Sequence, residues 1–158
     1  MLLKKSQISN LFLVILYNIL LIFIFHGDIL EKIKLSKREI SMTIEKIKTL
    51  LRADVLYGLD FLDREVQYAF SSDMMSDVLA FASEESALIT GLCNAQVVRT
   101  AEMLDIVCII FVRNKIPDQT ILALAQDKEI VILCTEHGMF NSCGILYSNG
   151  LRGGAFNQ

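Results

Sequence analysis

Apolar residues recur at helical spacing in several short segments that follow residue 42. Ile44, Ile47, Leu50 and Leu51 predict a helix over 43–51 with one apolar face. Polar residues that can cap a helix start precede three of the other four predicted helices. In the first of these, Ser71, Ser72 or Asp73 precedes the apolar residues Met75, Val78, Leu79 and Ala82; in the second, Asn94 precedes Val97, Val98, Ala101 and Leu104; in the third, Asp118 precedes Ile121, Leu122 and Ala125. The fourth predicted helix has Phe140, Cys143, Gly144 and Tyr147 on one face.

Strand patterns alternate with these helices along the chain. Val66, Tyr68 and Phe70 alternate with Gln67 and Ala69, which predicts a half-buried strand. Three continuous apolar runs, 87–90, 106–112 and 130–134, are typical of strands covered on both faces. Because each run is separated from the next by a helix, we predict an α/β fold with three layers and a mainly parallel sheet.

The first 41 residues differ from the rest of the chain. Residues 11–25 are apolar except for Asn18, and basic residues lie on both sides of them. Three interpretations stay open: a membrane anchor with the C-terminal domain in the cytoplasm, a signal peptide, or a start codon assigned too early, with Met42 as the true start. We therefore predict segments at 1–41, 42–151 and 152–158, the last a frayed tail, and expect 42–158 to fold without the first 41 residues.

Composition narrows the class of protein. The chain has 158 residues, 53% of them apolar, with one Pro and eight Gly, as expected for one globular domain. From Met42 onward there are 9 Lys+Arg and 15 Asp+Glu, so nucleic acid is not an expected partner. The four cysteines show no paired spacing, which favours reduced thiols and a cytoplasmic protein, with a single-pass membrane protein as the alternative.

Two loops are candidates for binding a small anionic ligand, such as a nucleotide or phosphate. Thr90, Gly91, Leu92, Cys93 and Asn94 leave one predicted strand, and Thr135, Glu136, His137 and Gly138 leave another. The carboxyl ends of parallel strands share one sheet edge, and N–H groups at helix starts attract anions. Ordinary tight turns explain the same residues. Arg99 either reaches this anion or pairs with Glu102 on the helix surface.

No catalytic or metal constellation stands out. Cys134, His137 and Cys93 form a weaker metal signal than paired CxxC motifs, and a Cys93–His137 nucleophilic pair has little support. Cys108 and Cys143 lie on apolar faces and are predicted core residues. We therefore predict no catalytic residue, no metal and no cofactor beyond a possible nucleotide or phosphate ligand.

The stretch from Met42 to Leu151 resembles the DRTGG domain family, in its short stand-alone form. The most specific matches are 90–92, 96–102 and 139–147. This family is related to the N-terminal domain of HPr kinase/phosphorylase, so the resemblance implies that fold and a non-enzymatic regulatory or ligand-sensing module. Such a module is expected to act as a homo-oligomer and through an unidentified protein partner. The chain has no GxxxxGK[ST] phosphate-binding loop, which argues against kinase activity. The alternatives are a phosphotransferase-related or thiol-dependent enzyme and a membrane-tethered adaptor.

Overall fold

The computed structural model describes residues 41–154, all within one compact unit, Ile40–Gln158. The apolar segment 11–25 and residues 155–158 lie outside the described part. None of the helices within 41–154 is long and apolar enough to cross a membrane. The three interpretations of the first 41 residues therefore remain predictions.

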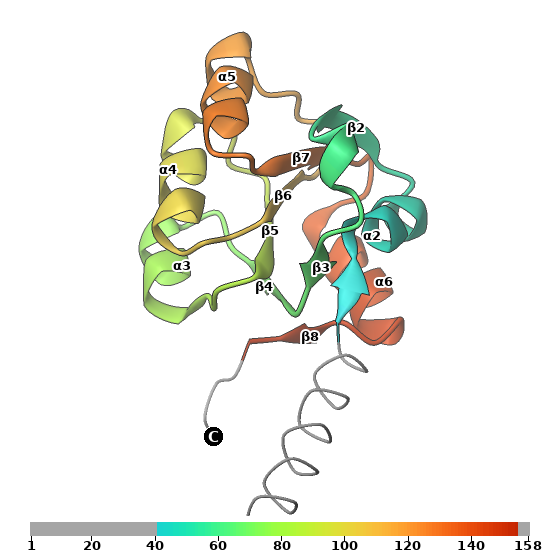
Figure 1. Cartoon of the computed structure of the whole chain (residues 1–158). Helices are drawn as coiled ribbons and strands as arrows, with labels where there is room; N and C mark the ends of the chain where they lie inside the picture. The colour runs from blue at the N-terminus through green and yellow to red at the C-terminus, as the bar shows by residue number, and fades with distance from the viewer. Residues whose placement is uncertain (1–40, 155–158) are drawn as a thin grey trace, which may run out of the picture. The chain divides into compact units, whose positions relative to one another are not determined.

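The described residues form short strands and helices that alternate along the chain (Figure 1). The strands are β1 (Met42–Thr43), β2 (Asp54–Tyr57), β3 (Glu65–Val66), β4 (Tyr68–Ser71), β5 (Ser86–Thr90), β6 (Cys108–Phe111), β7 (Val131–Cys134) and β8 (Arg152–Gly153). The helices are α2 (Ile44–Leu51), α3 (Met75–Phe81), α4 (Ala95–Met103), α5 (Gln119–Asp127) and α6 (Met139–Ser148), with a 3-10 turn, η1, at Leu59–Phe61.

Six of the described strands form one sheet in the order β2-β7-β6-β5-β4-β8. Strands β7, β6, β5, β4 and β8 run parallel to one another, and β2 pairs antiparallel with β7 at one edge of the sheet. All residues of β5, β6 and β7 are buried, which explains why their sequences are continuously apolar. The predicted α/β fold with a mainly parallel sheet is confirmed.

Helices cover both faces of this sheet and create two apolar cores (Figure 1). Side chains of one strand point alternately to the two faces, so Ile89 and Ile110 join the core under α2 and α6. Leu88 and Ile109 join the other core, under α3, α4 and α5. The three layers predicted from the sequence are therefore helices, sheet and helices.

Capping explains where three of the helices begin. The side chains of Thr43, Asn94 and Asp118 accept backbone N–H bonds at the starts of α2, α4 and α5. Helix α3 is present as predicted, but its predicted cap is wrong, because the N-cap is Met74, which makes no side-chain cap bond. Leu79, predicted to be buried, is 41% exposed.

Two further predictions from the sequence, for the segment around Val66 and for the buried face of α6, differ from the structure. The segment around Val66 splits: β3 pairs with β1 in a separate two-stranded sheet, while Tyr68 and Phe70 belong to β4. Helix α6 buries Ser142 and Leu146, so the predicted stripe of Phe140 and Tyr147 lies on its exposed side.

The predicted frayed tail is also corrected in part. Leu151 is buried, and β8 adds to the sheet beside β4, with Arg152 opposite Tyr68 and Gly153 opposite Ala69. Gly150 makes this return possible because its φ of +105° is a conformation that other residues rarely adopt. The chain therefore stays ordered beyond Asn149 and closes one edge of the sheet.

Replacing Gly58 should destabilise the fold far more than replacing Gly144. Gly58 has a φ of +92°, and an added Cβ would lie 2.9 Å from Val131 Cγ2. We expect Gly58→Ala to lower the free energy of unfolding by about 1–3 kcal/mol. Gly144→Ala adds the same methyl group in open space within a helix and should raise it by up to about 1 kcal/mol. Urea unfolding measures both, and equal stability of the two variants would contradict this reading of Gly58.

Candidate functional site

The loops that follow β4, β5, β6 and β7 lie at one edge of the sheet, where ligands of parallel sheets bind. The two predicted ligand loops, 90–94 and 135–138, both lie there, after β5 and β7. They are not direct neighbours, because β6 lies between their strands. The loop after β6, residues 112–115, therefore belongs to any site at this edge.

This β6 loop ties the two predicted loops together. Arg113 and Asn114 adopt left-handed backbone conformations, with φ of 62° and 50°. Their N–H groups donate to the carbonyls of His137 and Thr135, each at 2.9 Å. The ammonium of Lys115 donates to the carbonyl of Gly91. These contacts fix two cationic side chains at the sheet edge, which the sequence prediction did not include.

A carboxylate already occupies the position where the sequence predicts an anion. The hydroxyl of Thr90 donates to Asp73 Oδ1 at 3.0 Å, and the N–H of Gly91 donates to the same oxygen at 2.6 Å. The Arg113 guanidinium lies 3.7 Å from Asp73 Oδ2. Asp73, Thr90, Gly91, Arg113 and Lys115 are called the strand-end cluster below. The donors Thr90, Gly91 and Arg113 hold a carboxylate of the chain itself, and the binding of a separate ligand at these loops stays a prediction.

These contacts change the ionisation of Asp73. Partial burial acts to raise its pKa, but bonds from the Gly91 N–H and the Thr90 hydroxyl, with the Arg113 charge, outweigh burial. The pKa of Asp73 is therefore held below its ordinary value. The cluster stabilises the carboxylate form, and this stabilisation is present at neutral pH and lost as the pH falls through the lowered pKa.

The remaining residues of the first predicted loop have structural partners. The N–H of Leu92 donates to the Thr90 hydroxyl, and Asn94 accepts the Gln96 N–H as the cap of α4. Arg99 is exposed on α4, and its predicted pairing with Glu102 is wrong. Glu102 instead pairs with Lys128, at 3.0 Å.

The second predicted loop is held by a buried threonine. The Thr135 hydroxyl donates to the carbonyl of Leu51 at 2.7 Å and accepts the His137 N–H at 3.2 Å. Gly138 is the N-cap of α6 and supplies no side-chain bond, while Glu136 is exposed. Thr135 therefore anchors the loop to α2, and its hydroxyl points into the fold.

The thiols at this edge are not activated. All four cysteines are free. Burial raises the pKa of Cys93, and this outweighs the nearby charge of Lys115. Burial, with the charges of Asp54 and Cys93, also raises the pKa of Cys134. A thiol with a raised pKa is a weak nucleophile and metal ligand at neutral pH. Within 41–154, no three His, Cys, Asp or Glu side chains are grouped so that they could hold a metal ion.

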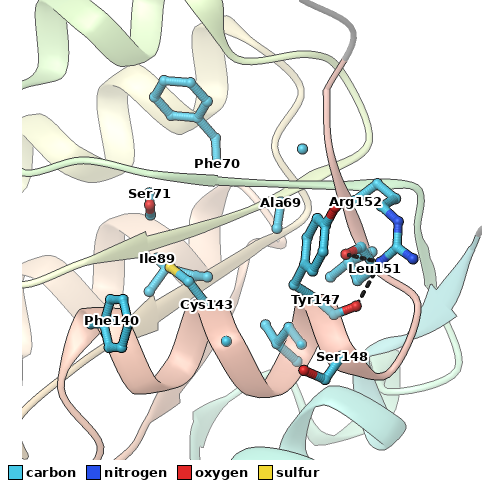
Figure 2. A pocket seen from close by; sticks show the side chains of 13 residues that line it. Ala69, Phe70, Ser71, Ile89, Phe140, Cys143, Tyr147, Ser148, Leu151 and Arg152 are labelled. Atoms are coloured by element: carbon cyan, nitrogen blue, oxygen red, sulfur yellow. Dashed lines mark hydrogen bonds between the residues drawn. The ribbon is translucent and has the colours of Figure 1, made fainter.

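A hollow, called the α6 groove below, lies between α6 and the strands β4 and β8 (Figure 2). Its volume is about 390 Å³. Thirteen residues line it: Ala69, Phe70, Ser71, Ile89, Phe140, Cys143, Gly144, Leu146, Tyr147, Ser148, Leu151, Arg152 and Gly153. The sequence pattern gives no sign of this groove, because the helical spacing of Phe140 and Tyr147 predicts a buried face and two residues at β8 are too few to predict a strand.

Small and aromatic residues together shape the α6 groove. Figure 2 shows Phe140, Cys143 and Tyr147 along one side of α6, facing into it, while the small Ala69 and Ser71 of β4 leave it open. Phe140 is 88% exposed and Tyr147 is 60% exposed. The guanidinium of Arg152 lies 4.2 Å from the centre of the Tyr147 ring, a cation–π contact at one end of the groove.

Replacing Arg113 should raise the pKa of Asp73. Arg113→Gln removes the positive charge 3.7 Å from Asp73 Oδ2 but leaves the Thr90 and Gly91 donors in place. We expect the carboxyl pKa, followed by carbon NMR, to move up toward its ordinary value. Arg99→Gln removes an equal charge from the exposed side of α4 and should leave it unchanged. An equal shift in both variants would show a general charge effect instead of a specific contact.

Of three comparisons with known proteins, the one with solved structures finds a protein of similar fold. No protein-family model matches the chain, and a search of curated proteins finds no match. A solved structure, the CBS and DRTGG domains of the regulatory region of Clostridium perfringens pyrophosphatase complexed with its activator diadenosine tetraphosphate, matches with a TM-score of 0.56 and 19% identity. The match covers 66% of this chain and 45% of the solved chain. The chain is thus similar in fold to a region with CBS and DRTGG domains and spans about half of its length.

Proposed function

We propose that this protein is a non-enzymatic regulatory module that binds a small phosphate-bearing ligand at the strand-end cluster. The observation that supports this most is the Asp73 carboxylate held by Thr90, Gly91 and Arg113. In proteins, phosphate oxygens accept hydrogen bonds from hydroxyls, backbone N–H groups, guanidinium groups and ammonium groups, all of which this cluster contains. A single phosphate needs only such a local group of donors, even in an acidic domain.

The solved neighbour adds support from outside the chain. It is a regulatory region in complex with diadenosine tetraphosphate, a nucleotide activator. A nucleotide is therefore a reasonable ligand class for a module of similar fold, and its phosphates suit the cationic Arg113 and Lys115. We also place the module in the cytoplasm, since its four free cysteines suit a reducing compartment.

The enzyme alternatives have less support. A thiol-dependent reaction needs an activated cysteine, whereas the pKa of Cys93 is raised. A kinase needs a built phosphate-transfer site, and the sequence lacks the GxxxxGK[ST] loop. Incubating the protein with labelled ATP and candidate acceptors tests this point directly, and phosphoryl transfer that survives repurification would overturn the non-enzymatic proposal.

Inorganic phosphate and ATP should bind at the strand-end cluster. Titrated into the nitrogen-15-labelled protein, they should shift the amide resonances of Gly91, Leu92 and Arg113, and rising salt should weaken the binding. Gly91→Ala should reduce affinity, because the added Cβ overlaps the Arg113 guanidinium and displaces it. Gly144→Ala adds a methyl group in open space and serves as the control. Shifts confined to residues far from the cluster, or no binding at all, would contradict the proposed site.

The partner that we propose for this module is a second copy of the same chain. Among the described strands, β8 lies at the edge of the sheet and borders the α6 groove. Two such edges can face each other about a twofold axis, in an interface where both copies use the same surface. Phe140 and Tyr147 would then lose their exposure to water, which favours association.

Polar replacements in the α6 groove should weaken self-association. We expect Phe140→Ser and Tyr147→Ser to raise the dissociation constant of the dimer at least tenfold, because each replacement removes an aromatic anchor. Leu59→Ser, at a side chain that is 68% exposed outside the groove, should leave the constant unchanged. Analytical ultracentrifugation measures all three. A monomeric wild-type protein, or an equal effect of Leu59→Ser, would contradict this interface.

A further inference from the structure

Asp73 connects the strand-end cluster to helix α3. It follows β4 by two residues, and only Met74 separates it from the first residue of α3. Ser72, on its other side, accepts the N–H of Met74 at 3.0 Å. Release of the Asp73 side chain from Thr90 and Gly91 therefore removes a tether two residues before the first residue of α3.

Helix α3 is shorter than the other helices on its face. It has seven residues, of which Met75 and Val78 are buried, while α4 and α5 have nine residues each. Its N-terminus has no side-chain cap, while α4 and α5 begin at Asn94 and Asp118, which cap them. Met74 and Leu79 are 59% and 41% exposed. The bonds of Asp73 thus add a tether next to the start of this helix.

A phosphate at the cluster would need the donors that Asp73 now uses. The Gly91 N–H has one hydrogen and gives it to Asp73 Oδ1, which also accepts the Thr90 hydroxyl. A carboxylate and a phosphate held by the same donors would repel each other across a few ångströms. Binding of one anion therefore requires release of the other.

We propose that Asp73 is an internal competitor for the ligand, and that an incoming phosphate displaces its carboxylate and releases the start of α3. This competition rests on the proposed function and deepens it, because it specifies how ligand binding at the cluster changes the exposed surface of α3. The exposed Met74 and Leu79 then change position with the ligand. Ligand binding at the sheet edge would thereby alter the exposed surface of α3.

The competition lowers the affinity of the wild-type site. The ligand binds only the fraction of molecules in which Asp73 has left the donors, so the apparent affinity falls by that fraction. Asp73→Asn keeps the size of the side chain but removes its charge, and it should raise the affinity for inorganic phosphate about tenfold. Asp60→Asn makes the same change in net charge at an exposed position of η1, outside both the cluster and α3, and should have little effect.

The experiment is an amide NMR titration of the full chain with inorganic phosphate. We expect phosphate to shift resonances of both the cluster and residues 75–81 in the wild type. In Asp73→Ala, which has no acceptor for the Thr90 and Gly91 donors, the α3 resonances should already lie close to their phosphate-bound positions before any phosphate is added. Asp73→Asn keeps an oxygen that accepts these donors, so its α3 resonances should stay close to the wild-type positions until phosphate is added.

The outcomes separate this inference from the proposed function. Weaker phosphate binding by Asp73→Asn would make Asp73 part of the ligand site and overturn the competition, while the proposed function stands. An equal gain in Asp60→Asn would reduce the effect to net charge and also overturn it. Phosphate binding at the cluster with no shift in residues 75–81 would refute the link to α3. If neither the wild type nor either Asp73 variant binds phosphate, the proposed function itself fails.

Discussion

The burial of both faces of the central strands is the constraint on which the rest of the structure depends. All residues of β5, β6 and β7 are buried, so apolar helix faces must cover the sheet on both sides. Parallel neighbours need helical crossovers, and each crossover returns the chain to the same starting edge. The loops after β5, β6 and β7 are thereby collected at the opposite edge, where the strand-end cluster forms.

The strand-end cluster shows how a fold of this kind brings distant residues together. Asp73 follows β4, Thr90 and Gly91 end β5, and Arg113 and Lys115 follow β6. Thr90, Gly91 and Arg113 contact the Asp73 carboxylate, and Lys115 joins the same group through the Gly91 carbonyl. Because Asp73 lies only two residues before the first residue of α3, the sheet edge and this helix are adjacent along the covalent chain.

The α6 groove depends on the opposite property, which is incomplete coverage. Helix α6 crosses the sheet face and leads to β8, which joins the sheet beside β4. The small Ala69 and Ser71 and the exposed Phe140 and Tyr147 leave this edge hollow and apolar. The chain thus has two surfaces of different chemistry, a polar one at the strand ends and an apolar one along α6.

Local patterns in the sequence determined the parallel core, its three layers, and the starts of α2, α4 and α5. Burial on both faces and side-chain caps depend on residues close in the sequence, so these features are readable without a structure. Tertiary contacts decided the rest. The sequence shows that Asp73 can cap a helix but not that Thr90 and Gly91, on another strand, will hold it instead. It shows apolar spacing in α6 but not which side faces the sheet, and two residues at Arg152–Gly153 are too short to predict a strand without β4 beside them.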